Sequence, residues 1–310
     1  MPDITAGFAA FPDRHALKHD LAPDGREALA YMLMIPEEGI AGFIYPSRHA
    51  SGPGKARAKL FGPGLETPLD IEAEADCPPG MDFDDWQVGP MRMVLREPHK
   101  RIDLEWNDDR MHFKGQYEAL HPPYAFSSHP DGVPAYYGDD RTEQHGRLSA
   151  DISIDGRQFS HEGFLVYDHS WGPRVWGLNQ HYKWIHFVTA NTSVHFFEMQ
   201  SFGRLHQRGF LWKDGRMRHL AHIDYDIAYD ETMWQKTFDV RVTDTDGRKV
   251  AIESRTFAKT RLDWAVDVYL NEAAVTLEMD GQSGVGWVEF CWNRNYFDIA
   301  KQHVERFGAA

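Results

Sequence analysis

The chain has 310 residues, of which 42% are hydrophobic and 13% aromatic. This length exceeds that of a typical single core, so we expect two domains or one large β domain. Asp and Glu number 47 against 33 Lys and Arg, for a net charge of −14. Because a negative surface repels phosphate backbones and anionic lipid, nucleic acid and membranes are excluded as favoured partners.

Few features point to a secreted or membrane protein. The two cysteines, Cys77 and Cys291, lie far apart and form neither a disulfide framework nor a metal-binding spacing. Residues 1–20 lack a basic region followed by an apolar core, so no signal peptide is expected. No apolar run reaches the roughly 18 residues of a membrane-spanning helix. We therefore predict a cytoplasmic protein without membrane insertion.

The first half of the chain has strand-like patterns. Residues 1–26 are loop-like, and residues 27–44 predict two strands joined by the turn sequence PEEG. Residues 46–63 are polar and glycine-rich, which favours a loop. Alternation follows at 70–75 and in three further segments, and in one of these Ile102, Leu104 and Trp106 share a face. The pair Asp155-Gly156 then predicts a hairpin.

The second half repeats this pattern. Asp-Gly pairs at 214–215, 246–247 and 280–281 separate short apolar segments, and only the sequence AKQHVERF near the C-terminus favours a helix. Many short strands with frequent turns indicate an all-β sandwich or barrel. Because no βαβ alternation and no glycine-rich nucleotide motif occurs, no nucleotide cofactor is expected.

One stretch concentrates acid–base groups. Residues 163–177, GFLVYDHSWGPRVWG, begin as an apolar strand that the Gly-Pro pair at 172–173 terminates. The groups near the end of this strand are Asp168, His169, Ser170, Trp171 and Arg174. Polar groups at a strand end are held on a rigid frame while their tips can face a cavity. The alternative is a structural corner, since buried polar clusters often serve only the fold.

This stretch resembles a known signature. Asp168-His169-Ser170-Trp171-Gly172 is similar to the DH-x-WG motif of the carotenoid 1,2-hydratase (hydroxyneurosporene synthase) and AttH-like superfamily. Residues 118–123 and 279–286 also resemble stretches of bacterial relatives. The resemblance implies two consecutive lipocalin-like β-barrel domains, and we add a short C-terminal helix. We place an N-terminal extension at 1–26 and the two domains at 27–155 and 156–310.

The resemblance also implies roles for single residues. In the hydratases the residues that match His169 and Trp171, with a Tyr-x-Asp pair on a following strand, are implicated in protonating an olefin. Here the later pair reads Phe196-x-Glu198. Glu198 shares a face with apolar neighbours, where a carboxylate is costly unless it is solvated, paired or catalytic. An outward-facing strand is the alternative for Glu198.

The remaining candidates follow from position and residue type. Adjacent strand residues point to opposite faces, so His169 and Asp168 are not expected to bond each other, and Asp168 can pair with Arg174. We expect catalytic roles for His169, Glu198, Asp168 and Arg174. Expected substrate contacts come from Trp171, Trp176, Tyr182, Trp184, Phe196, His121 and Glu118, with ordinary core or solvent-facing positions as the alternative. Glu143 and His145 are further acid–base candidates.

No metal site is predicted. The tripeptide His222-Ile223-Asp224 fits half of an iron site with two histidines and one carboxylate, and no HExxH motif occurs. We therefore predict a cofactor-independent lyase, hydratase or isomerase that uses acid–base catalysis on an apolar aromatic or terpenoid molecule. The expected binding place is a cavity between the two β domains. The alternative is a carrier of a hydrophobic small molecule without chemistry, and a homodimer is allowed in either case.

Overall fold

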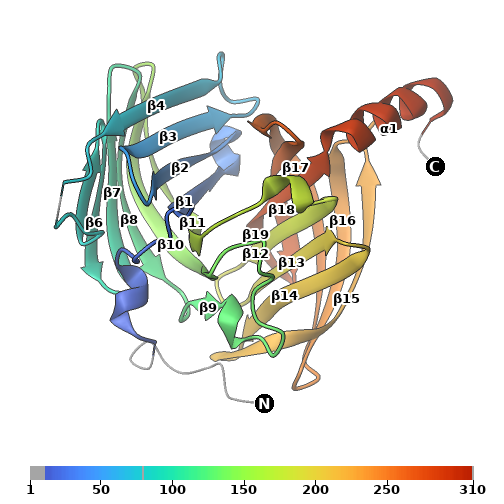
Figure 1. Ribbon diagram of the computed structural model, residues 1–310. Coiled ribbons are helices and arrows are strands. Elements are labelled where there is room, and N and C mark those ends of the chain that lie inside the picture. Colours follow the sequence, from blue (N-terminus) through green and yellow to red (C-terminus); the bar gives the residue numbers. More distant parts are fainter. Residues whose placement is uncertain (1–10, 79, 309–310) are drawn as a thin grey trace. The chain divides into compact units, whose positions relative to one another are not determined.

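The computed structural model describes residues 11–78 and 80–308 (Figure 1). The first ten residues of the expected N-terminal extension therefore lie outside the described part. The chain forms two compact units. Unit 1 comprises Met1–Ile35, Gly42–Leu60 and Thr67–Arg174, and unit 2 comprises Pro36–Ala41, Phe61–Glu66 and Val175–Ala310.

Unit 1 is built on an 11-stranded sheet in the order β4-β3-β2-β1-β11-β10-β8-β7-β6-β5, with β9 beside β10. The pairs β1–β11, β10–β11, β8–β10, β9–β10 and β7–β8 are antiparallel. The strands are β1 (Arg26–Ile35), β2 (Ile40–His49), β3 (Gly54–Phe61), β4 (Leu69–Ala75), β5 (Asp85–Val88), β6 (Met91–Glu97), β7 (Arg101–Asn107), β8 (Met111–Ala119), β9 (Tyr124–Ala125), β10 (Asp140–Ile154) and β11 (Arg157–Gly172).

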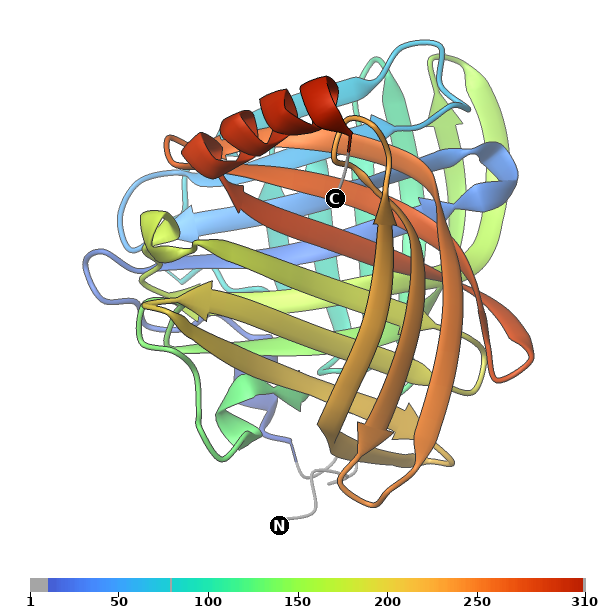
Figure 2. The same cartoon turned by 90° about the vertical axis from the view of Figure 1, so that its right-hand side faces the viewer.

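Unit 2 contains a closed barrel of sequentially neighbouring strands, β12 to β19 (Figures 1 and 2). The strands are β12 (His181–Val188), β13 (Ser193–Ser201), β14 (Arg204–Lys213), β15 (Arg216–Tyr229), β16 (Gln235–Asp244), β17 (Lys249–Ala265), β18 (Val268–Met279) and β19 (Gln282–Asn293). The barrel core holds mainly branched and aromatic side chains, such as Ile185, Phe196 and Val288. The predicted all-β fold with two barrel-like domains is confirmed.

The strand patterns explain the sheets. In β7 the side chains of Ile102, Leu104 and Trp106 are buried while their neighbours are more exposed, as the alternation predicts. The Asp155-Gly156 and Asp280-Gly281 pairs each close a hairpin, and all four residues have positive φ angles. Two consecutive positive φ angles are typical of the type I′ turn, whose twist matches that of the flanking strands. Both predicted hairpins are confirmed.

Helical elements are few in the described part of the chain. A single α-helix, α1 (Arg294–Phe307), follows β19 within the described residues and lies at one end of the barrel (Figure 2). Its N-cap is Asn293, whose side chain accepts a hydrogen bond from the Tyr296 amide. Four 3-10 turns complete the described elements: η2 (Asp13–Ala16), η3 (Pro36–Glu38), η4 (Phe126–Ser128) and η5 (Trp176–Leu178). No helix in residues 11–78 or 80–308 is long and apolar enough to cross a membrane.

The prediction of a loop at residues 46–63 is wrong, because β2 continues to His49 and β3 begins at Gly54. In β3 the buried face carries the small residues Ala56 and Ala58, which give a weak hydrophobic signal. The opposite face is charged, and Arg57 forms an ion pair with Asp70 on β4. Because alanine is only weakly hydrophobic, the sequence of β3 was interpreted as a polar loop.

The border between the domains was expected near residue 155, which is the hairpin turn between β10 and β11. In the structure β11 returns from this turn and pairs with both β10 and β1. The two units divide between Arg174 and Val175, after β11 ends at Gly172. The border therefore falls behind the Gly-Pro pair that follows the signature residues.

Candidate active site

The register of β11 decides which face each signature residue occupies. His169 lies opposite Leu29 of β1, and Trp171 lies opposite Glu27. These four residues therefore share one face of the sheet, because paired residues in antiparallel strands point to the same side. Asp168 belongs to the other face. This is the arrangement expected from the alternation of a strand.

His169 is fully buried, and both of its ring nitrogens are engaged. Nε2 lies 2.9 Å from Oε1 of Glu27, and Nδ1 lies 3.1 Å from the backbone oxygen of His15. The Phe83 ring contacts the imidazole edge-on with ring centroids 5.7 Å apart. A carbonyl and a carboxylate are both acceptors, so the ring satisfies both only with a hydrogen on each nitrogen. An imidazole with a hydrogen on each nitrogen is chemically able to donate a proton.

Glu27 is the centre of this cluster, and its carboxylate has no solvent exposure. Arg48 donates from Nε and Nη2 to Oε2 at 2.9 and 2.7 Å, while His19 Nδ1 lies 2.7 Å from Oε1. Burial alone would raise the pKa of Glu27, but hydrogen bonds from His169 and His19 and nearby positive charge lower it to about 2. The buried carboxylate is therefore ionised at neutral pH.

The segment before β1 covers this cluster. The His19 ring lies flat on Trp171, with ring centroids 3.7 Å apart and planes 9° apart. Nδ1 of His15 lies 3.3 Å from Nε2 of His19. The backbone amide of Lys18 donates to Asp82 at 2.8 Å, and His99 Nε2 lies 3.0 Å from the oxygen of Pro12. His169 is thus shielded from solvent by residues of its own unit.

The other face of β11 carries a second charged cluster. Asp168 forms an ion pair with Arg141, which also pairs with Glu143. Burial disfavours the charge of Arg141, but the two carboxylates outweigh it and raise the pKa of the guanidinium. The pairing of Asp168 with Arg174 was expected, and Arg141 takes that place instead. Arg174 donates to the oxygen of Tyr137 and lies over its ring at 4.5 Å.

His121 and Glu118 do not lie together. His121 is fully buried, and its Nε2 lies 3.1 Å from Nδ1 of His145. Burial lowers the pKa of His121 to about 4, so its imidazole is neutral at physiological pH. Glu118 is exposed on β8, opposite Arg101 and Arg147 of the neighbouring strands. The exposed position matches the alternative of a solvent-facing residue.

Glu198 belongs to the barrel of unit 2 and is paired. Its carboxylate accepts hydrogen bonds from Tyr225 at 2.6 Å and from Gln207 at 2.5 Å, and Lys183 lies 3.3 Å away. Burial and the neighbouring Glu198 raise the pKa of the Tyr225 phenol. His169 lies in unit 1, so the joint action of His169 and Glu198 stays a prediction.

The predicted aromatic contacts in unit 2 fall into different environments. Phe196 lies in the barrel core and stacks against Tyr225, whereas Trp176 contacts Trp264 at a centroid distance of 6.0 Å. Trp184 is buried on β12. Tyr182 is also buried and donates its hydroxyl to Glu289. Core packing, the stated alternative, describes Phe196.

A second buried acid in unit 2 was not predicted. Glu272 is buried opposite Glu289 and accepts a hydrogen bond from Trp287 Nε1 at 2.8 Å. Burial, and then the charge of Glu289, raise the pKa of Glu272 well above its ordinary value. Glu272 is therefore protonated over a wider pH range than an exposed glutamate.

Sequence reasoning missed Glu27, His19 and Arg48. A signal was present, because the segment REALAYMLMI places one acid at the start of an otherwise apolar strand. His19 and Arg48 lie in segments that were interpreted as loop, where a polar residue carries no periodic signal.

The cluster also has the composition of a metal site. Ligand atoms of His19, Glu27 and His169 all lie within 4.8 Å of one another. Two histidines and one carboxylate suit a divalent transition metal. Arg48, however, holds a positive charge against the same carboxylate, which opposes a second cation. The alternative metal residues His222 and Asp224 are exposed on β15.

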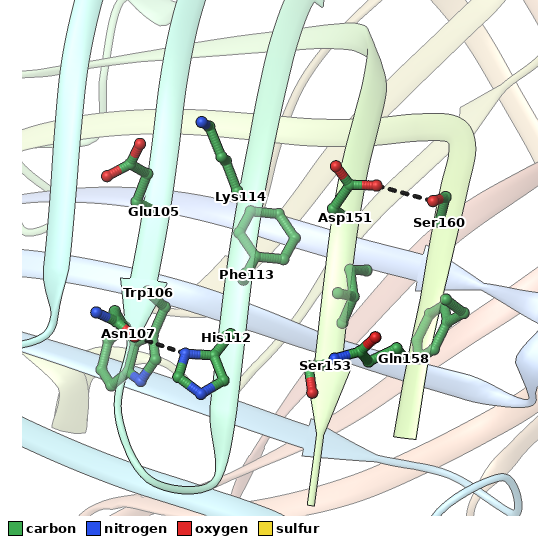
Figure 3. A pocket seen from close by; sticks show the side chains of 12 residues that line it. Glu105, Trp106, Asn107, His112, Phe113, Lys114, Asp151, Ser153, Gln158 and Ser160 are labelled. Atoms are coloured by element: carbon green, nitrogen blue, oxygen red, sulfur yellow. Dashed lines mark hydrogen bonds between the residues drawn. The ribbon is translucent and has the colours of Figure 1, made fainter. Parts of the chain in front are cut away.

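A pocket of about 670 Å³ lies elsewhere in unit 1 (Figure 3). It opens on the outward face of β7, β8, β10 and β11. Figure 3 shows a row of polar side chains across these strands, which includes Glu105, Lys114, Asp151 and Ser160. None of the residues predicted for the active site lines this pocket. It is open to solvent, and its charged and polar side chains alternate with the apolar Trp106, Phe113, Ile152 and Phe159.

Solved structures share this fold. The AttH-like protein of Nitrosomonas europaea superimposes with a TM-score of 0.64 at 14% identity, over 94% of this chain and 98% of that chain. Kievitone hydratase from Nectria haematococca gives 0.58 at 9% identity, over 96% and 97%. CghA with Sch210972 gives 0.60 at 11% identity, over 87% and 89%. These low identities show a common fold alone.

The fold expected from the DH-x-WG resemblance, that of the carotenoid hydratase and AttH-like superfamily, is therefore confirmed. No curated protein matches the sequence significantly. A family model described as a domain of unknown function, DUF7064, matches residues 12–294. This match spans nearly the whole chain and includes both units, so the chain belongs to the DUF7064 family.

Proposed function

We propose that the protein is a cofactor-independent lyase, hydratase or isomerase that transfers a proton to or from an apolar small molecule through His169. The observation that carries this proposal is the buried Glu27 carboxylate held between His169, His19 and Arg48. Kievitone hydratase has the same fold and is named for a hydration. Its reaction class is therefore the first to test on this chain.

The proposed roles follow from the contacts. Glu27 fixes the imidazole through Nε2 and stabilises its positive charge, while Arg48 holds the carboxylate in place. Nδ1 is then the working nitrogen, because its present partner is a backbone carbonyl of the preceding segment. Proton transfer from Nδ1 to an olefin carbon leaves His169 neutral, with its remaining hydrogen on Nε2 toward Glu27. Water then adds to the resulting carbocation and returns one proton to Nδ1, which completes a hydration, and the reverse sequence is a dehydration.

The other predicted residues keep secondary roles in this proposal. Asp168 and Arg174 position the strand end, and Trp171 provides an aromatic wall beside His169. Glu198, Tyr182, Trp184, Trp176 and Phe196 belong to unit 2, where we propose that Glu198 assists proton transfer. His121 and Glu118 remain proposed substrate contacts.

The carrier alternative requires an apolar interior without convergent ionisable groups. His169 points to the same face as Glu27, and this supports the enzyme over the carrier. Burying an ionised carboxylate is expensive, and a carrier of apolar ligands has no use for it.

The test uses deuterium. The protein is incubated in D₂O with a panel of apolar olefins and aromatic or terpenoid alcohols, and the products are analysed by mass spectrometry. Carbon-bound deuterium, or the gain or loss of one water, is expected for at least one class. His169→Gln should abolish this signal while the exposed-site variant His112→Gln retains it. Molecules that co-purify with the protein but return unchanged, with no deuterium at carbon, would establish the carrier.

A further inference from the structure

The segment that covers His169 makes the kinds of contact that a bound ligand would make. We call residues 11–20 the cap. Two features of the cap meet the two groups that a substrate would use: the flat His19 ring lies on Trp171, and the His15 carbonyl accepts from Nδ1 of His169. The two contacts are an aromatic stack and one hydrogen bond to an oxygen acceptor. A molecule with a planar ring and an oxygen can make both.

We propose that the cap occupies the substrate site of unit 1 and is displaced by a planar, unsaturated or aromatic molecule that carries a carbonyl or hydroxyl oxygen. The inference rests on the proposed function, since it places the substrate at the working nitrogen of His169. The ring of the molecule stacks on Trp171 in the place of His19. Its oxygen, or the olefin carbon beside it, meets Nδ1 in the place of the His15 carbonyl.

The charges around His169 narrow the class of molecule that can bind in place of the cap. With a hydrogen on each nitrogen, His169 contributes one positive charge and Arg48 another, against one negative charge on Glu27. This excess of positive charge favours an oxygen acceptor and disfavours an amine. The neighbouring rings of Trp171 and Phe83 favour a flat apolar body.

The cap contacts the acid–base groups through His19, whose amide donates to Glu27 and whose backbone oxygen accepts from Arg48, and it is also anchored away from them by Lys18. It contains no β-strand, and its only regular element is the four-residue turn η2. The Lys18 amide donates to Asp82 at 2.8 Å, and Lys18 Nζ donates to the oxygen of Met81 at 2.5 Å. A ligand that binds only when the cap is displaced has its affinity reduced in proportion to the fraction of molecules in that open state. Loosening the cap raises this fraction, so it should strengthen binding.

The experiment measures equilibrium binding of 2-naphthol, a planar aromatic alcohol, to the full-length protein by quenching of tryptophan fluorescence. Asp82→Ala and Lys18→Ala each remove one anchoring side chain, and each should tighten binding about five-fold, the effect of one ordinary hydrogen bond. Asp70→Ala is the matched control, since it removes an exposed carboxylate that pairs with Arg57 and Lys59. Trp171→Leu should weaken binding in every background.

A second measurement needs only the wild-type protein. Hydrogen exchange of the amides in residues 11–20 should become faster when 2-naphthol is added, because the ligand displaces the cap. Slower or unchanged exchange on saturation, equal affinity in the Asp82→Ala and Asp70→Ala variants, or no binding at all would each overturn the inference. These outcomes are independent of the deuterium test, because a protein that turns over a substrate without displacing the cap refutes only the inference.

Discussion

Replacing Glu27 by Gln is the sharpest perturbation of the site. The change keeps the shape of the side chain and removes its charge. Arg48 is then left without its counter-charge in a mostly buried position, and His169 loses the charged acceptor of Nε2. We expect a large loss of stability in unit 1, together with loss of the proposed activity.

The magnitude follows from the pKa. The pKa of Glu27 falls from its ordinary value of 4.5 to about 2. At about 1.4 kcal/mol for each pH unit between the two values, ionisation of Glu27 contributes about 3 kcal/mol to the free energy of unfolding. Because the folded-state pKa is the lower one, this stability is fully present above pH 4.5 and is lost as the pH falls toward 2. Removal of one partner of a buried ion pair costs about 3–5 kcal/mol, which agrees.

The assay is urea unfolding followed by tryptophan fluorescence and circular dichroism, at pH 7 and at steps down to pH 2. The Glu27→Gln protein should unfold at lower urea with a difference of about 3 kcal/mol at pH 7. Below pH 4.5 the wild type should lose stability more steeply than the variant, so the two curves converge. Glu118→Gln on β8 is the control, because Glu118 is exposed.

One result would refute this reasoning. If Glu27→Gln and Glu118→Gln unfold at the same urea concentration and show parallel pH curves, Glu27 is not an ionised, charge-paired carboxylate. The assignment of a proton to both nitrogens of His169 would then lose its basis.

Three further predictions concern other groups. His169→Gln should keep the fold and lower turnover of a substrate found by the deuterium test by about 10²–10⁴-fold, and Glu198→Gln should lower it too; a double variant that loses the full product of both effects would show that they act independently. Glu272→Gln should make the stability of the protein less dependent on pH. Because the pKa of Glu272 is raised in the folded state, the contribution of this group to stability is fully present below pH 4.5 and is lost as the pH rises. Thermal melts between pH 5 and 9 measure this contribution, and parallel slopes for wild type and variant contradict the prediction. Turnover should survive dialysis against a chelator, whereas loss that zinc or iron restores would assign His19, Glu27 and His169 as metal ligands.

The sequence predicted the fold well because strands leave a local signal. Alternation identified β7, and two Asp-Gly pairs located hairpins that the structure confirms. The same reasoning failed at β3, where Ala56 and Ala58 form the buried face. Periodicity depends on contrast between faces, and alanine provides little of it.

The site was predicted only in part, for a different reason. His169 and the opposite orientation of Asp168 follow from one strand, whereas their partners come from other segments. Glu27 meets His169 only because β1 pairs with β11, more than a hundred residues later in the chain. A pairing between distant strands cannot be read from local pattern, so Arg141 was not foreseen as the partner of Asp168.

Stability alone does not account for the Glu27 cluster. Taking a carboxylate, a guanidinium and an imidazole out of water costs several kcal/mol for each ion, and apolar residues of similar size often serve a core equally well. At this strand end an apolar core was available, since Leu29 and Phe83 already lie beside His169. A chain that nevertheless buries an ionised carboxylate against an imidazole has acquired a fixed proton site. The Gly-Pro break behind Trp171 and the non-strand cap in front of His169 leave this pair at the end of β11, where we propose that displacing one short segment exposes it.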